Sequence, residues 1–259
     1  MILGILTASM LAERRYPEGV WDCDGIELRA DGLPATAVVS AGQDFNTEKK
    51  RHSFNGPVFF TLRLQRDGGA WENARATERE PLWTALAESS NLLCDYLDIE
   101  IQEVGLLDWN TLKKFRAAGL KLLLSHHSFV AETTGDWEKL LALMRGYHPD
   151  AVKFAVTTED SQKAGDLLRF AKQVAREFHV SCVIAMGEAG RATRVASPFL
   201  GCPITYAFLE SSAVAPGQLS VKVLRYCFAQ TQGKPAQDSS EKEWIAWVEQ
   251  TLRDANHVA

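Results

Sequence analysis

Lys153 stands inside an apolar run, "AVKFAV", between Val152 and Phe154. A lysine amine attacks ketones and aldehydes once it is neutral, and the product is a Schiff base. The resulting iminium withdraws electrons from the neighbouring carbon, which permits carbanion chemistry there. The apolar setting of Lys153 therefore makes it a candidate nucleophile.

Charged and imidazole side chains occupy one face of four other apolar runs. Because side chains alternate along a strand, "IELRAD" separates Glu27 and Arg29 from its aliphatic residues. The same alternation adds Arg63 of "FFTLR", Glu100 of "LDIEI" and His127 of "LLLSHHSF". It places His126 on the opposite, aliphatic face. Charged residues are rarely buried without a partner or a purpose, so we expect this set to share one pocket with Lys153.

Each of these side chains, taken alone, has a structural explanation. A strand lysine can pair with a carboxylate or extend its amine to water, and Arg29 could form a buried pair with Glu27. A histidine beside a strand end is often structural. Repetition of the pattern over five consecutive strands favours a functional pocket.

The composition of the pocket predicts a reaction class. Arg29, Arg63 and also Arg194 near Lys153 would disfavour the ammonium form, as would desolvation. Arginines also suit a carboxylate or phosphate on a substrate. The set predicts a Schiff-base lyase or aldolase that acts on an anionic carbonyl compound without a metal or an organic cofactor.

The set also contains a residue that could act as a general acid or base. His127 could move the proton, since imidazole titrates near neutrality, and Glu100 could orient the imidazole.

Eight apolar runs alternating with amphipathic segments would position these side chains. We expect strands at 2–7, 25–31, 57–64, 96–104, 121–129, 150–157, 181–186 and 203–209. We expect helices near 35–42, with a loop through "NTEKKRH", and at 78–95, 109–119, 136–147, 160–178, 220–228 and 240–254. Asp136 and Asp160 are predicted N-caps, and Gly119 a C-terminal stop.

This alternation over 259 residues predicts an α/β fold, a single (β/α)8 TIM barrel covering residues 1–259. Late strand positions would then lie at the C-terminal mouth, where barrel enzymes keep their active sites. An open doubly wound sheet is the alternative. No GxGxxG or GxxxxGK[ST] follows a strand, which weakens it.

Bulk composition excludes several classes of partner. The chain is 46% hydrophobic and 24% charged, with a net charge of −5, which argues against nucleic acid or an anionic membrane. The apolar start "MILGILTASML" lacks a basic region and is interpreted as a strand rather than a signal peptide. Five widely spaced cysteines without a CxxC predict neither disulfides nor zinc, and we expect a cytoplasmic protein.

Seven segments in order resemble those of type I 3-dehydroquinate dehydratases, the Schiff-base enzymes of the shikimate pathway. They are "IELRAD", "FFTLRLQRDGG", "LDIEI", "SHHSF", "VKFAV", "MGEAGRATRVAS" and "APGQLSVKVLR". Together they span nearly the whole chain. The resemblance implies dehydration of 3-dehydroquinate to 3-dehydroshikimate and a homodimer.

The resemblance also implies a role for each residue. Lys153 would form the imine with the C3 ketone. His127 would remove the C2 proton and assist loss of the C1 hydroxyl, and Glu100 would hold the histidine. Arg194 would bind the substrate carboxylate. The remaining substrate-binding residues implied are Glu27, Arg29, Arg63 and Gln218, with "SSAVAPGQ" as the loop over the substrate.

Two positions depart from the family pattern. Val214 stands where the family usually has a serine, for which Ser211 or Ser212 could substitute, and Ser128 replaces the usual aspartate after the histidine. Two alternatives stay open: a class I aldolase on the same barrel, and a non-catalytic relative that binds a small acid.

Overall fold

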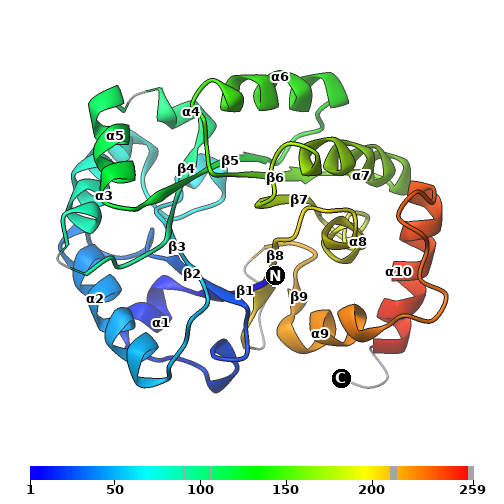
Figure 1. The fold of residues 1–259 in the computed structure, drawn as a ribbon, viewed down its shortest axis with the longest axis horizontal. Coiled ribbons are helices and arrows are strands. Elements are labelled where there is room, and N and C mark those ends of the chain that lie inside the picture. The colour runs from blue at the N-terminus through cyan, green and yellow to red at the C-terminus, as the bar shows by residue number, and fades with distance from the viewer. Residues whose placement is uncertain (90, 106, 211–214, 256–259) are drawn as a thin grey trace.

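The computed structural model describes residues 1–89, 91–105, 107–210 and 215–255, and it places the strands in an inner ring with helices outside (Figure 1). The strands are β1 Ile2–Leu6, β2 Gly25–Arg29, β3 Val58–Thr61, β4 Tyr96–Glu100, β5 Lys121–Ser128, β6 Ala151–Thr157, β7 Ser181–Met186, β8 Thr205–Phe208 and β9 Leu219–Ser220. The α-helices are α1 Ala8–Ala12, α2 Ala35–Arg51, α3 Arg79–Ala87, α4 Ile101–Val104, α5 Trp109–Ala117, α6 Thr134–Arg145, α7 Ser161–Ala175, α8 Thr193–Phe199, α9 Val221–Ala229 and α10 Glu241–Ala255. Three 3₁₀ helices join them: η1 Glu18–Val20, η2 Gln65–Asp67 and η3 Asn73–Glu78.

All pairings in the sheet are parallel, in the order β7-β6-β5-β4-β3-β2-β1-β8-β9. The sheet curls until its two sides approach each other near the start of β8. There the backbone N–H of Ile204 donates to the carbonyl of Ser181 at 3.0 Å. The predicted α/β barrel is therefore confirmed, and the open doubly wound sheet is not formed.

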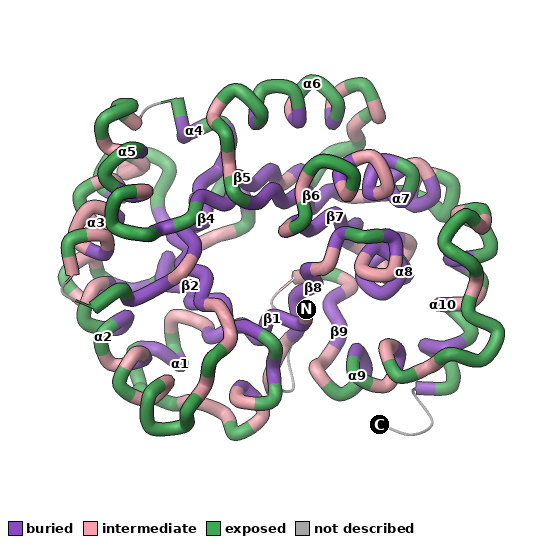
Figure 2. The backbone as a smooth tube through the Cα atoms, in the orientation of Figure 1, coloured by how far each residue is buried: buried purple, intermediate pink, exposed green. Residues whose placement is uncertain are grey.

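The two faces of the strands bury different cores, as the alternation predicts. Leu28, Phe60 and Phe154 pack outward in the core beneath the helices. Phe59 and Tyr96 point inward and stack with ring centroids 4.4 Å apart. These inward side chains come early in their strands, so they fill the N-terminal half of the barrel. Figure 2 shows the strands buried along most of their length, while the helices alternate between buried and exposed.

Several helices differ from the sequence-based expectation. Helix α2 continues to Arg51 through the segment expected to be a loop. Its inner face buries Val38 and Phe45, and its last turn is basic, which complements the partial negative charge of a helix C-terminus. The short helices α1, α4 and α8 were not expected, because each is too brief to show a period in the sequence.

Helix termini agree in part with the prediction. Asp160 is the N-cap of α7, and Gly119, with φ of +88°, follows the end of α5. Asp136, however, is the third helical residue of α6. The N-cap is Thr133, and the two residues form a capping box.

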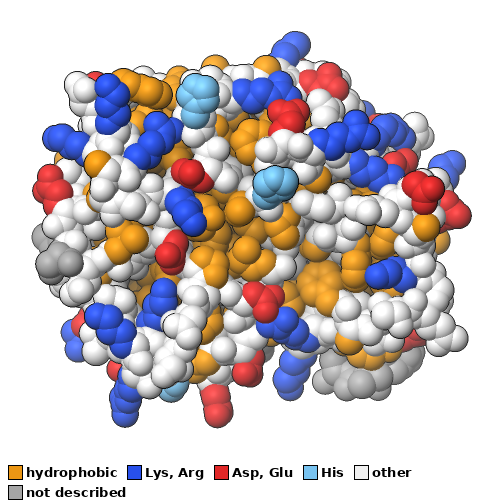
Figure 3. Space-filling model, viewed as in Figure 1, with side chains coloured by type: hydrophobic (Ala, Val, Ile, Leu, Met, Phe, Trp, Pro, Cys, Tyr) orange, Lys and Arg blue, Asp and Glu red, His pale blue; other side chains and the backbone are white. Residues whose placement is uncertain are grey.

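Figure 3 shows hydrophobic side chains gathered over the centre of one face, with acidic and basic side chains interspersed around them. Within the described residues, no helix combines the length and the apolar character needed to cross a bilayer.

Candidate active site

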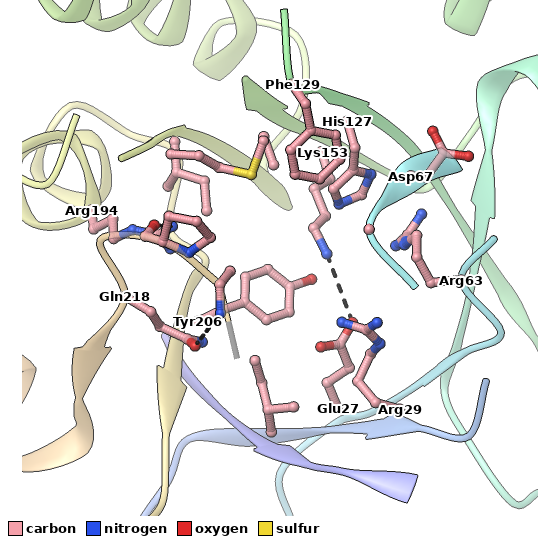
Figure 4. A pocket seen from close by; sticks show the side chains of 17 residues that line it. Glu27, Arg29, Arg63, Asp67, His127, Phe129, Lys153, Arg194, Tyr206 and Gln218 are labelled. Carbon is pink, nitrogen blue, oxygen red and sulfur yellow. Dashed lines mark hydrogen bonds and ion pairs between the residues drawn. The ribbon is translucent and has the colours of Figure 1, made fainter. Parts of the chain in front are cut away.

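A cavity lies at the C-terminal ends of the strands, above the inward-facing core (Figure 4). Its empty volume is about 640 Å³, which includes open solvent at its mouth. The polar side chains that line it are Glu27, Arg29, Arg63, Asp67, His127, Lys153, Arg194, Tyr206 and Gln218. The fold therefore brings together every predicted site residue except Glu100.

Lys153 projects from the middle of β6 into this cavity and is 5% exposed. Its Nζ lies 3.4 Å from Asp98 Oδ2 and 3.7 Å from Glu27 Oε1. The amine also sits 4.0 Å from the centre of the Tyr206 ring. We expected arginines around the amine, but the charged groups in contact with it are carboxylates. Both carboxylates would attract an ammonium group at this position.

Arg63 is buried beside these carboxylates, and one of them, Asp98, contacts both Arg63 and Lys153. Its Nη2 donates to Asp98 Oδ2 at 2.5 Å, and its Nη1 donates to Ser125 at 2.7 Å. Burial opposes ionisation of Asp98, but Arg63 and Lys153 outweigh it and lower the pKa of that carboxyl. Asp98 is therefore a fixed anion shared by the two cations.

His127 points into the cavity from β5, and His126 points away from it, as predicted. His126 instead contacts Glu132 at 2.9 Å and Gln102 at 3.1 Å on the helix side. Burial, followed by the positive charges of Arg63 and Lys153, lowers the pKa of His127 well below its usual value. The imidazole is therefore uncharged at neutral pH and can accept a proton.

The structure does not show the predicted contact between Glu100 and His127. One oxygen of Glu100 accepts from Leu64 N at 3.2 Å and lies 3.3 Å from Arg63 Nη1. The other accepts from Arg79 Nη1 at 2.7 Å. Within the described residues, Nδ1 of His127 has no hydrogen-bond partner. Contrary to expectation, Glu100 does not line the cavity, because its carboxylate pairs with two arginines, Arg63 and Arg79.

Asp67 is a carboxylate on the cavity wall that the sequence-based reasoning left without a role. It ends η2, in the turn after β3, and contacts Arg66 at 3.4 Å. Burial, followed by the negative charge of Glu100, raises its pKa. The available signal was its place in "RLQRDGG", as the acidic residue before two glycines.

Arg194 lines the opposite wall from the first turn of α8. Its Nη2 donates to the carbonyl of Pro216 at 3.1 Å, and its Nε has no partner among the described residues. No salt bridge reaches it in the described part of the chain. Burial lowers its pKa to about 10, so it is still a cation at neutral pH. An uncompensated buried cation on a cavity wall is a site for an anion.

The family model described as type I 3-dehydroquinase matches residues 9–235. The chain belongs to the type I 3-dehydroquinase family.

Individual members of the family agree in sequence and in structure. The 3-dehydroquinate dehydratase of Methanococcoides burtonii is 35% identical over 78% of this chain and 82% of its own length. That of Lactococcus lactis subsp. lactis is 33% identical over 78% and 84%. The crystal structure of the Aquifex aeolicus enzyme superposes with a TM-score of 0.70 and 27% identity, covering 89% of this chain and 100% of that one.

The remaining residues of this dehydroquinase site complete the rim. Arg29 pairs with Asp31 at 2.8 Å while still lining the cavity, and Gln218 accepts from Ala215 N at 3.3 Å. Pro216 also lines the cavity, as expected of the loop after β8. The earlier part of that loop, with Ser211, Ser212 and Val214, lies outside the described residues.

Two aromatic residues of this dehydroquinase site were not anticipated. Tyr206 of β8 lines the cavity, and its buried hydroxyl has no partner among the described residues. Burial, followed by the charge of Glu27, raises its pKa well above the usual value, so it stays a neutral phenol. Phe129, 49% exposed, lies at the mouth. Neither carries a charge, so the pattern of charged strand residues did not reveal them.

Proposed function

We propose that this dehydroquinase converts 3-dehydroquinate to 3-dehydroshikimate and water through a Schiff base on Lys153. The observation that carries the proposal is one cavity holding a buried lysine, an uncharged histidine and an arginine that has no counter-ion among the described residues. Family membership supports the choice of substrate.

The first stage would form the imine. The Lys153 ammonium loses a proton to Glu27, whose Oε1 lies 3.7 Å from the amine and accepts one hydrogen bond among the described residues, from Thr61. Asp98, by contrast, is engaged by both Arg63 and Ser125. The amine attacks the C3 ketone to give a carbinolamine, which loses water and becomes an iminium. The positive nitrogen then acidifies the hydrogens at C2.

The second stage would be the elimination. Neutral His127 accepts the C2 proton, and the electron pair forms an enamine. The C1 hydroxyl leaves as water when the imidazolium returns a proton to it. Hydrolysis of the conjugated iminium releases 3-dehydroshikimate and restores Lys153.

The other polar side chains would orient the substrate. Arg194 binds the carboxylate, for which it has an uncompensated charge. Arg29 and Gln218 lie on the rim within the same cavity and contact ring hydroxyls. Arg63 acts mainly on Asp98, and Asp67 is a further carboxylate on the cavity wall.

Formation of the conjugated enone, followed by ultraviolet absorbance, tests this function. We expect turnover by the wild-type protein and its loss in Lys153→Ala. Lys121→Ala is the matched control, because Lys121 also lies in a barrel strand but is exposed, beside Tyr96. No absorbance change with the wild-type protein, or wild-type activity in Lys153→Ala, would refute the proposal.

The same assay separates dehydration from the two alternatives, neither of which would form the enone. A class I aldolase would release an aldehyde from a sugar phosphate and leave 3-dehydroquinate unchanged, and a non-catalytic relative would bind without turnover. Family membership favours dehydration over both. A homodimer and a cytoplasmic location stay predictions, and analytical ultracentrifugation checks the first.

A further inference from the structure

Arg79 is a buried arginine that does not line the cavity. It begins α3 on the outer side of the barrel, and its guanidinium lies 4.9 Å from the Trp83 ring. It donates to the carbonyls of Ala76 (3.2 Å) and Leu62 (2.7 Å) and to the carboxylates of Glu100 (2.7 Å) and Glu103 (3.2 Å). Every one of its nitrogens is thus engaged, and the bonds join α3 to η3, to the residue that follows β3, to β4 and to α4.

Two of these bonds fix the backbone on both sides of Arg63. Arg79 holds the carbonyl of Leu62, the residue before Arg63. Glu100, which Arg79 also holds, accepts from the backbone N–H of Leu64, the residue after it. The Arg79–Glu100 pair therefore fixes the position of the Arg63 backbone, from which the Arg63 side chain projects.

A line of alternating charges continues from this pair to the reactive amine. Glu100 lies 3.3 Å from Arg63 Nη1, and Arg63 Nη2 donates to Asp98 at 2.5 Å. The same oxygen of Asp98 lies 3.4 Å from Lys153 Nζ. All five side chains are buried, so each interaction is only weakly screened by water.

We propose that Arg79 is a positioning residue for Lys153, acting through Glu100, Arg63 and Asp98; this rests on the proposed dehydratase function. Without Arg79, Glu100 would have Arg63 as its remaining buried cation and would attract it. Arg63 would then neutralise Asp98 less well. Asp98 would then attract the Lys153 ammonium more strongly and would hold this amine away from the C3 ketone of the substrate.

Kinetics of Arg79→Met test the proposal, with Arg75→Met as the matched control. Arg75 also lies over a tryptophan, Trp71, but it pairs with exposed Glu78 and does not touch the charge line. We expect kcat per folded molecule to fall about tenfold in Arg79→Met, within the range for residues that influence a site without touching the ligand. KM should change much less, because the cavity wall is intact. Arg75→Met should match the wild-type protein.

Two further measurements separate positioning from a purely structural role. If Arg79 acts through Glu100, adding Arg79→Met to Glu100→Gln should lower kcat much less than it does in the wild-type background. Arg79→Lys keeps the charge beside Glu100 but loses the branched guanidinium that donates to several acceptors at once. Its kcat should therefore lie between those of Arg79→Met and the wild-type protein. Additive effects in the double variant would overturn the proposal.

The proposal can still be tested if Arg79→Met does not fold. Should Arg79→Met fail to fold, Arg79→Lys decides: a wild-type kcat in the folded protein would overturn the proposal, and a reduced kcat with little change in KM supports it. A wild-type protein without dehydratase activity would overturn the proposed function itself. An active wild-type protein with an equally active Arg79→Met would overturn this inference alone.

Discussion

At the scale of single residues, the site is built from cations with different degrees of neutralisation. Lys153 contacts Asp98 and Glu27, and Arg29 pairs with Asp31. Among the described residues, Arg194 donates to a backbone carbonyl, that of Pro216, and has no carboxylate partner. Burying such a charge costs free energy that a bound anion would recover. Burial of the Arg194 charge thus lowers the stability of the ligand-free protein and raises its affinity for an anionic substrate.

Replacing Arg194 with methionine should separate these two effects. We expect KM for 3-dehydroquinate to rise about 10- to 100-fold, the equivalent of a lost hydrogen bond to a charged group. Thermal unfolding of the ligand-free protein should occur at the same or a higher temperature, because an uncompensated charge has been removed. Arg191→Met is the control, since Arg191 pairs with Glu188 on the same segment. An unchanged KM would show that Arg194 does not hold the substrate.

At the scale of elements, the turn after β3 carries Asp67 to the cavity wall and depends on two glycines. Gly68 has φ of +79°, a conformation that side chains disfavour. A Cβ on Gly69 would lie 2.0 Å from the carbonyl oxygen of Arg63, which accepts from Trp71 N at 3.0 Å. The turn therefore closes directly onto the strand end that holds Arg63.

Gly69→Ala should weaken both the fold and the site. The methyl group must displace backbone, so we expect the free energy of unfolding to fall by about 1–3 kcal/mol, as for overpacked positions. The dehydration rate should fall as well, because Asp67 and Arg63 move together. Gly135→Ala in α6 is the control, since its Cβ would meet only Thr133 at an ordinary 3.7 Å. Chemical denaturation and the enone assay measure the two effects, and wild-type values in both would contradict this account of the turn.

The same elements show what the sequence can predict. The direction of His127 and Lys153 follows from a period of two along a strand, which is a local property. The roles of Glu100 and Asp67 do not follow from this period, because they depend on which side chains meet across β3, β4 and α3. Arg79 lies 21 residues from Glu100 in the chain, and no periodicity relates them. Helix α2 is longer than predicted because the residues after Phe45 are all polar and show no apolar pattern.

At the scale of the whole molecule, His127 links the site to stability. Its pKa is lowered in the folded protein, chiefly by burial, whereas an unfolded histidine titrates near 6.5. Below that pH the unfolded chain binds a proton that the folded protein does not. The free energy of unfolding therefore falls as the pH drops through about 6.5, by up to about 1.4 kcal/mol per pH unit.

His127→Gln should reduce this acid sensitivity. We expect the difference in unfolding free energy between pH 7 and pH 5 to be smaller by about 1–2 kcal/mol than in the wild-type protein. His179→Gln is the control, because His179 is exposed. Urea denaturation at several pH values provides the measurement. Parallel pH profiles for the wild-type protein and His127→Gln would contradict the lowered pKa of His127.

Reduction by sodium borohydride in the presence of 3-dehydroquinate tests the central claim, the imine on Lys153, most directly. The account predicts a stable covalent adduct that mass spectrometry places on the peptide containing Lys153. It also predicts loss of activity in proportion to the adduct, and no adduct in Lys153→Ala. Turnover of 3-dehydroquinate without a trapped adduct, or an adduct on a different lysine, would contradict it.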